Sequence, residues 1–318
     1  MCGREALEMA RAFGFEGAAL APVRGPVAYA PNAEAVRQGI VAQPDALMPG
    51  ARSVLVLAVP FSWFAPWPDG HAEVSAFYFA SQRAHLALRA LADALQARGV
   101  RVQARQTLAA KVWGMRAGLG VQGRNTLLKN DVWGSRFALR TLVCDLPAED
   151  APPDPLPARA CGDCRRCVEA CPTGALDGRG NLATERCLRA HMLCGAPVPE
   201  PLRALMGARL LGCEICQRVC PANASAACVP PDAEPFALET LLRAQKADLL
   251  PIAQRIGANE ARAGRLRAQA ALAAGNSGDA SLIPLLRALA SAPTQAVAEH
   301  ARWALARMEN KHGEERLC

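Results

Sequence analysis

The chain has 318 residues, of which 51% are apolar and 20% are charged, and its formal net charge is +7 at pH 7. This length predicts two to three domains, and the composition is that of a packed globular protein and excludes extensive disorder. The positive charge is spread along the chain, which allows a polyanionic partner such as RNA but does not require one.

The first 150 residues alternate between helical and strand patterns, which predicts an α/β domain. An amphipathic helix is predicted at 5–13, an apolar segment at 17–23 and a buried strand at 52–61. A helix at 74–98 ends before Gly99, where a C-terminal stop is expected. The remaining predicted elements are a strand at 100–104, a helix at 113–119, a turn at 120–123 and a strand at 140–146.

The rest of the chain divides at a segment rich in proline and acidic residues, 148–159, which predicts a linker. We therefore expect domains at 1–150, 151–235 and 236–318. The last contains apolar residues at helical spacing on both sides of Pro293, which predicts an all-α domain with a HEAT-like repeat. These residues are Leu282, Leu285, Leu286 and Leu289, then Val297, Ala301, Leu305 and Met308.

No apolar run reaches the roughly 20 residues that a bilayer span requires, and the longest lies at 54–61. The first 15 residues lack the apolar stretch of a signal peptide. We expect a cytoplasmic protein with no membrane contact, and we expect it to be a monomer. Most of the thirteen cysteines lie between 161 and 228 at ligand spacing, so metal binding is favoured over a disulfide framework.

Two runs of cysteine predict two [4Fe–4S] clusters in a ferredoxin-like domain. The first run has the spacing C-x2-C-x2-C-x3-C followed by proline, as in bacterial ferredoxins, where the fourth cysteine ligates the other cluster. The second run, C-x2-C-x3-C followed by proline, lacks one cysteine, which Cys187 is predicted to supply. The predicted ligands are Cys161, Cys164, Cys167 and Cys220 for cluster 1, and Cys171, Cys187, Cys213 and Cys216 for cluster 2.

Other interpretations of the cysteines stay open. Cys194 and Cys228 compete with Cys187 for the fourth position, and a zinc knuckle competes with the clusters. Three cysteines far from the runs are predicted to be plain thiols: Cys2, Cys144 and Cys318.

Two clusters form a path for electrons, which requires an external low-potential donor at one end and a redox centre at the other. The region 1–150 is the only predicted domain large enough to hold that centre. It contains neither a Walker lysine loop nor a strand-linked GxGxxG fingerprint, because AGLGVQG at 117–123 has the wrong spacing. Nicotinamide and ATP are therefore not supported.

Several motifs together resemble the epoxyqueuosine reductase family, the cobalamin-dependent, double-cluster enzymes that complete the queuosine modification of tRNA. They extend over nearly the whole chain. The motifs are RAGLGVQGRNTLL at 116–128, GSRFAL at 134–139, CGDCRRCVEACPTGAL at 161–176, Arg186-Cys187, LLGCEICQRVCPAN at 210–223, AALAAGN at 270–276 and EHARWAL at 299–305.

The resemblance implies that the clusters reduce a bound cobalamin and that the C-terminal helices hold a tRNA anticodon arm. It places the corrinoid pocket at Gly118, Gly120, Gly123, Asn125 and Ser135. Five arginines could meet phosphates, or could simply be solvated surface: Arg265, Arg267, Arg287, Arg302 and Arg307.

The sequence departs from the family where a proton donor is expected. The family's aspartate falls at Ala104, and no Asp or Glu lies between residues 100 and 129. Arg140-Thr141 replaces a Gly-Glu pair, and Gln106 cannot act as an acid at neutral pH. Tyr78 and His85 are the remaining candidates. The alternatives are a related reductase with another substrate, with or without cobalamin, and an electron-transfer protein with no catalytic role.

Overall fold

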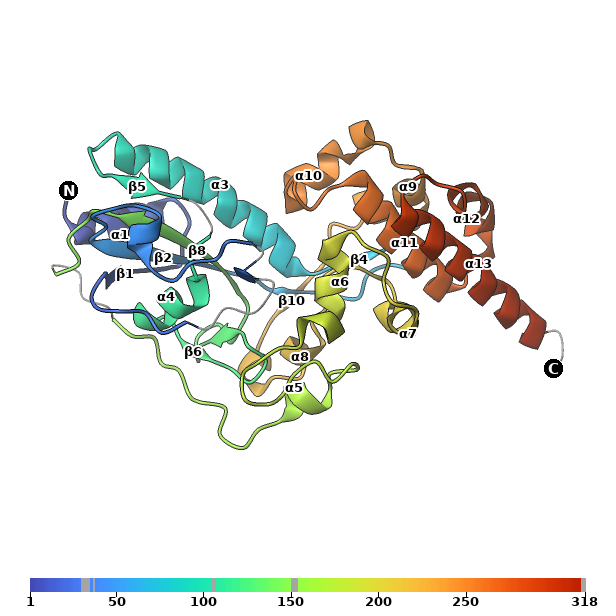
Figure 1. Ribbon diagram of the computed structural model, residues 1–318, viewed down its shortest axis with the longest axis horizontal. Helices are drawn as coiled ribbons and strands as arrows, with labels where there is room; N and C mark the ends of the chain where they lie inside the picture. Colours follow the sequence, from blue (N-terminus) through green and yellow to red (C-terminus); the bar gives the residue numbers. More distant parts are fainter. Residues whose placement is uncertain (30–34, 37, 105–106, 150–153, 316–318) are drawn as a thin grey trace.

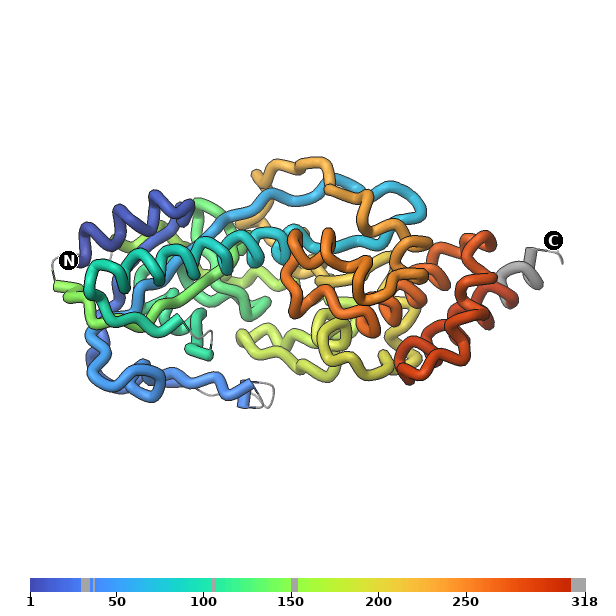
Figure 2. Tube along the Cα trace, turned by 90° about the horizontal axis from the view of Figure 1, so that it is seen from above, coloured from blue at the N-terminus to red at the C-terminus, as the bar shows by residue number. Residues whose placement is uncertain are grey.

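The computed structural model describes residues 1–29, 35, 36, 38–104, 107–149 and 154–315. The molecule is elongated, and its termini lie at opposite ends in both views (Figures 1 and 2). An α/β region occupies the N-terminal end, the cysteine-rich region lies in the middle, and a helical region forms the C-terminal end. Gln106 and Cys318 lie outside the described residues.

The N-terminal region is built on a four-stranded antiparallel sheet of order β1-β2-β8-β5. Its strands are β1 (Gly17–Pro22), β2 (Ser53–Pro60), β8 (Phe137–Cys144) and β5 (Val102–Gln103). β2 pairs along its full length with β8, from Ser53↔Cys144 to Pro60↔Phe137, and its residues 53–58 pair with β1 on the other side. The strands predicted at 52–61 and 140–146 are confirmed, the apolar segment predicted at 17–23 forms β1, and the strand predicted at 100–104 shortens to two residues.

Both faces of this sheet are covered, which explains the uninterrupted apolar run in β2. Leu55 and Leu57 face α1 (Gly3–Ala12) and α3 (Ala76–Gln96), whereas Val54 and Val56 face the other side. There the buried Trp113 of α4 (Ala110–Arg116) packs against them. The helices predicted at 5–13 and 74–98 are confirmed, and the one predicted at 113–119 begins and ends three residues earlier.

The segment after α4 differs from the predicted turn. Residues Val121–Gln122 form β6, which pairs antiparallel with β7 (Leu128–Lys129). The helix ends before this hairpin because Gly118 adopts φ +74°, a left-handed conformation that glycine accepts without strain.

The cysteine-rich region consists of short helices and turns joined to the N-terminal region by two pairs of parallel strands. β3 (Trp63–Phe64) pairs with β10 (Cys228–Val229), and β4 (Glu73–Val74) pairs with β9 (Arg209–Leu211). The helical elements are α5 (Arg166–Glu169), η2 (Thr184–Arg186), α6 (Leu188–Cys194), α7 (Glu200–Arg203), η3 (Ala204–Met206), α8 (Ile215–Arg218) and η4 (Pro221–Asn223).

The C-terminal region is helical, as predicted, and shares one core with the cysteine-rich region. Leu188 and Met192 of α6 pack in the same buried cluster as Leu272 and Met308. Whether these helices form a HEAT-like repeat stays a prediction. They are α9 (Leu238–Arg243), α10 (Leu250–Ile256), α11 (Ala263–Ser277), α12 (Ile283–Leu289) and α13 (Gln295–Glu315). Among the described residues, no helix is both long and apolar enough to cross a bilayer.

A buried histidine ties α13 to the cysteine-rich region. His300 is 0% exposed, its Nε2 accepts a hydrogen bond from the Val198 N–H at 2.8 Å, and its Nδ1 donates to the Ala268 carbonyl at 2.8 Å. Because a main-chain N–H can only donate, the ring must be neutral. Burial lowers the pKa of His300 from 6.5 to about 4.

This histidine predicts acid sensitivity. Between pH 6.5 and about pH 4, His300 is protonated in the unfolded chain but stays neutral in the folded protein. The contribution of His300 to the free energy of unfolding therefore falls as the pH drops through this window. The loss amounts to about 3 kcal/mol at most. Urea unfolding followed by circular dichroism should show this slope in the parent chain and in a control, His71→Gln in a surface loop. A slope of equal size in His300→Gln would contradict the assignment.

Candidate metal centre

The predicted ligand cysteines lie in two groups. Within each group the cysteines are close enough for the charge of one thiolate to raise the pKa of another. Burial raises the pKa of Cys167, and the charges of Cys220, Cys161 and Cys164 raise it further. Burial also raises the pKa of Cys220, with further contributions from Cys161 and Cys164. Cys220 therefore joins the first three cysteines, although more than 50 residues separate it from them in the sequence.

The second group forms around Cys216. Burial raises its pKa to about 12, followed by the charges of Cys213, Cys187, Cys167 and Cys171. Because Cys167 belongs to the first group, the two groups are neighbours. Cys213 has its pKa raised by burial and also by Cys187 and Cys171. The lone cysteine between the runs thus lies with the second group.

The other cysteines lie elsewhere. Cys194 and Cys228 are exposed, on α6 and β10, and Cys228 lies opposite Trp63. Cys2 accepts a hydrogen bond from the Glu5 N–H and caps α1. Cys144 is buried beside the Ser53 hydroxyl, with Sγ and Oγ 3.2 Å apart, and burial raises its pKa. None of the twelve described cysteines forms a disulfide.

This set of thiols fits iron–sulfur clusters better than a single metal ion. In the described part of the chain, no three Cys, His, Asp or Glu side chains converge closely enough to hold one ion. A [4Fe–4S] cluster spreads its ligands over four iron atoms, so it suits sulfur atoms that are farther apart. Burial raises the pKa values of Cys167, Cys213, Cys216 and Cys220, so these thiols would release protons when iron binds.

The glycine-rich segment 116–129 covers the first cysteine loop, 161–180. The side-chain amide of Gln122 donates to the Gly180 carbonyl at 2.8 Å. The guanidinium of Arg124 donates to the Gly178 carbonyl and, at 2.6 Å, to the Gly162 carbonyl. Arg124 therefore joins the two ends of the loop. Neither residue was predicted as functional, although polar side chains inside a glycine-rich hairpin were a signal.

The residues predicted for a corrinoid pocket are used in contacts within the chain. Gly118 lies against Pro155, and Gly120 lies so close to the Lys129 carbonyl that a Cβ would clash. A Cβ on Gly123 would meet the Asn125 side chain, which accepts a hydrogen bond from the Leu127 N–H. These glycines permit close packing.

Ser135 is 5% exposed and lies against the second cysteine run. Its N–H donates to Asn223 Oδ1 at 2.8 Å, and its hydroxyl accepts from Asn223 and Gln217. The five predicted residues therefore make contacts within the chain, and these contacts do not identify a corrinoid site. None of the five lines the two hollows beside the cysteine runs.

The two proton-donor candidates have different surroundings. Tyr78 is 3% exposed in the core shared with the helical region, and burial raises its pKa, which makes it a weaker acid. His85 is exposed on α3, where partial burial and the charges of Arg140 and Arg89 lower its pKa and favour the neutral ring at pH 7. Neither environment favours proton donation.

The positions that depart from the family pattern have structural contacts. Ala104 packs against the apolar core between the sheet and α3. The Arg140 guanidinium donates to the Ser81 carbonyl and, at 2.8 Å, to its hydroxyl, which joins β8 to α3.

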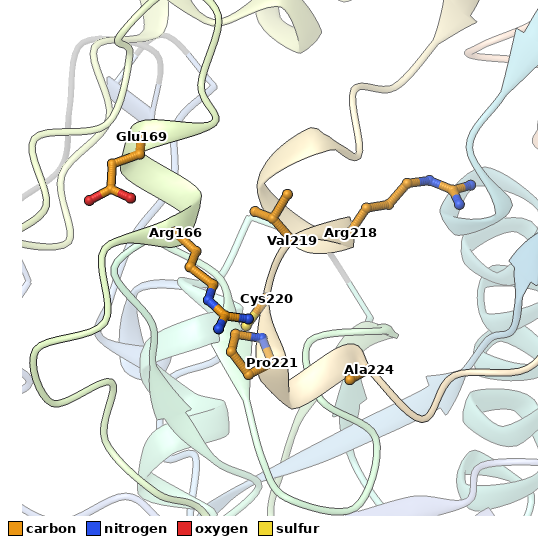
Figure 3. Close-up of a pocket in the computed structure, with 7 residues that line it drawn as sticks. All are labelled: Arg166, Glu169, Arg218, Val219, Cys220, Pro221 and Ala224. Carbon is orange, nitrogen blue, oxygen red and sulfur yellow. The ribbon is translucent and has the colours of Figure 1, made fainter.

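Two hollows lie beside the cysteine runs. The first, about 460 Å³, lies between α5 and α8 and is lined by Arg166, Glu169, Arg218, Val219, Cys220, Pro221 and Ala224 (Figure 3). The second, about 320 Å³, is lined by residues 64–67 and 73–75, and by Arg209, Gly212, Glu214, Ile215 and Arg218.

Comparison with known proteins agrees with this geometry. Residues 160–223 match a 4Fe-4S double cluster binding domain. The chain is 36% identical over 208 residues to an epoxyqueuosine reductase from Lactococcus garvieae and 37% identical over 210 residues to one from Pseudomonas aeruginosa. The chain is related to the epoxyqueuosine reductase family. Each match covers 62% of this chain, and they cover 58% and 56% of the two relatives.

The fold is shared with solved epoxyqueuosine reductases. The structure from Streptococcus thermophilus superposes with a TM-score of 0.80 at 22% identity, covering 96% of this chain and 90% of that one. A crystal structure of an epoxyqueuosine reductase with an epoxyqueuosine-modified tRNA-Tyr stem loop superposes with a TM-score of 0.78 at 23% identity, covering 96% and 89%.

The predicted ligand sets can be tested by iron content. We expect Cys187→Ala to lose about half of the iron and acid-labile sulfide, because one of two clusters lacks a ligand. Cys194→Ala and Cys228→Ala, the matched controls, should keep the parent content after anaerobic reconstitution. If Cys187→Ala kept the parent iron content and one of the controls lost iron, the residue replaced in that control would be the fourth ligand instead of Cys187.

The contact between the glycine-rich segment and the first cysteine loop makes a second prediction. Arg124→Ala removes donors to two loop carbonyls, so iron should be extracted by a chelator several-fold faster than from the parent. The control is Arg116→Ala, whose guanidinium lies over Trp113 and donates to the Arg24 carbonyl, away from the loop. Equal extraction rates for parent and Arg124→Ala would mean that the contact does not protect the cluster.

Proposed function

We propose that the chain is an iron–sulfur reductase that deoxygenates epoxyqueuosine in tRNA to queuosine. The observation that carries the proposal is the gathering of eight thiols from three separate segments into two adjacent groups, in a chain related to epoxyqueuosine reductases. We assign Cys161, Cys164, Cys167 and Cys220 to one cluster and Cys171, Cys187, Cys213 and Cys216 to the other.

The chemistry matches a two-cluster protein. Removal of an epoxide oxygen as water consumes two electrons and two protons, and each [4Fe–4S] cluster carries one electron at a time. Adjacent clusters can therefore supply the electron pair after two single-electron deliveries from an external donor. Cys213 and Cys216 are half-buried, and this burial raises the pKa values of their thiols.

Cobalamin is the group that the resemblance implies between the clusters and the substrate, where it would supply a low-valent cobalt nucleophile. The contacts of Gly118, Gly120, Gly123, Asn125 and Ser135 do not identify its place in this chain. The function is therefore to be tested both with and without added cobalamin.

Of the five arginines predicted to meet tRNA phosphates, two are exposed. Arg287 and Arg302 are exposed on α12 and α13, although Arg302 also donates to the Ala290 carbonyl at 2.7 Å. By contrast, Arg265 forms an ion pair with Glu260 at 2.9 Å, Arg267 donates to the Ala244 carbonyl, and Arg307 lies over Trp303. We propose phosphate contacts for Arg287 and Arg302 and structural roles for the other three.

A second candidate function follows from the missing acid. Because Ala104 packs in the core and residues 100–129 contain no Asp or Glu, a reductase acting on another substrate is the alternative. An electron-transfer protein that neither turns over epoxyqueuosine nor binds RNA would be a third outcome.

The deciding experiment uses the full chain, reconstituted anaerobically with iron and sulfide. A tRNA stem loop carrying epoxyqueuosine is incubated with the reduced protein, with and without cobalamin, and its nucleosides are analysed by mass spectrometry. We expect conversion to queuosine, and its loss in Cys216→Ala. Intact clusters without conversion, both with and without cobalamin, would favour a reductase that acts on another substrate. If the protein also failed to shift the stem loop in a gel mobility assay, an electron-transfer protein would be favoured.

A further inference from the structure

The hollow between α5 and α8 opens on a predicted cluster ligand. Cys220 lines it, together with Val219 and Pro221 from the second run and Arg166 from the first. Figure 3 shows Arg166 reaching from α5 toward Cys220 and Pro221, whereas Glu169 points away from them. The hollow therefore brings the surface close to the first thiol group and places a positive charge beside it.

The arginines at this surface are available to a partner. Within the described residues, the exposed Arg166 side chain has no hydrogen-bond or ion-pair partner. The neighbouring Arg165 is also exposed, but its guanidinium lies beside Gly178 and does not line the hollow. Arg218 lines the hollow from α8; it pairs with Glu214 at 3.0 Å and lies over the Trp63 ring, but its side chain remains 47% exposed. Glu169 also lines the hollow, with its carboxylate directed away from Cys220, and Asp163 is exposed on the same segment.

Two other sides of the thiol groups are covered by the chain. The glycine-rich segment lies over the first cysteine loop through Gln122 and Arg124. On the side of the second group, α6 and the buried Tyr78 join the core of the helical region. The α5–α8 hollow is thus an exposed route to a thiol that the N-terminal and helical regions leave uncovered.

We propose that the α5–α8 hollow and its arginines, Arg166 and Arg218, are the docking surface for an acidic one-electron donor protein. This inference rests on the proposed function only in requiring that the first thiol group carries a cluster. Electron transfer falls off steeply with distance, so a donor must approach a cluster ligand. Redox partners form small, transient interfaces, in which opposite charges speed the encounter rather than supply much affinity.

The electron balance is simple. A donor such as flavodoxin in its hydroquinone state loses one electron and becomes the semiquinone, and the cluster held by Cys161, Cys164, Cys167 and Cys220 gains that electron. A second donor molecule repeats the step after the first electron has moved to the neighbouring cluster. The donor is the only co-reactant.

The test compares reduction of the full, reconstituted chain by an acidic flavodoxin hydroquinone, without RNA, in a stopped-flow instrument. Arg166→Glu should lower the second-order rate constant about tenfold at low ionic strength, and the difference should vanish at high salt. Photoreduced deazariboflavin, a small uncharged reductant, should reduce variant and parent equally fast. The milder Arg166→Gln should lie between them.

The matched control is Arg83→Glu, which makes the same charge change at an exposed arginine of α3. It should leave the flavodoxin rate unchanged. Binding of oxidised flavodoxin, measured by calorimetry at low salt, adds a readout without electron transfer and should weaken only in the Arg166 variants.

A flavodoxin rate in Arg166→Glu equal to the parent at low salt would overturn the proposal. The proposal would also be overturned if Arg166→Glu bound the stem-loop RNA more weakly but was reduced by flavodoxin at the parent rate. That result would mean that this surface binds RNA. Because the assay contains no RNA, a charge-dependent flavodoxin rate would uphold the docking surface even if epoxyqueuosine were never converted.

Discussion

The contact between the glycine-rich segment and the first cysteine loop organises the molecule. Gln122 and Arg124 satisfy main-chain carbonyls at both ends of a loop that has almost no secondary structure of its own. A buried or half-buried loop needs such partners, because an unpaired carbonyl costs free energy. The hairpin that carries these side chains can form only because Gly120 lets its backbone approach Lys129. The sheet thereby positions the loop that would hold a cluster.

The second cysteine run is held from the same side by different chemistry. Asn223, two residues after the Cys-Pro pair, is 3% exposed and bonds the main chain and hydroxyl of Ser135, and Gln217 adds a further contact. Both cysteine runs therefore rest on the segment between α4 and β8. This arrangement explains why residues that resemble a cofactor-binding motif can serve packing: their polar groups are already paired within the chain.

The helical region is part of the same body rather than an appendage. α6, which follows Cys187, packs its Leu188 and Met192 into the core of α9 to α13, and His300 anchors α13 to Val198. Movement of these helices would therefore be transmitted to the segment that carries Cys187. If RNA binds at Arg287 and Arg302, its binding would be coupled to the second thiol group through packed side chains.

Features that depend on near neighbours were predictable from the sequence. The spacing of Cys161 to Cys171 predicts cluster chemistry because a short loop must wrap its ligands. The apolar run at 54–61 and the leucines of α3 predict a strand and a helix. Features that depend on distant contacts were decided by the tertiary structure. These include the partners of Arg124 and Ser135, the burial of Tyr78 and the neutral ring of His300. Each brings together segments that meet only after folding, so no local pattern records them.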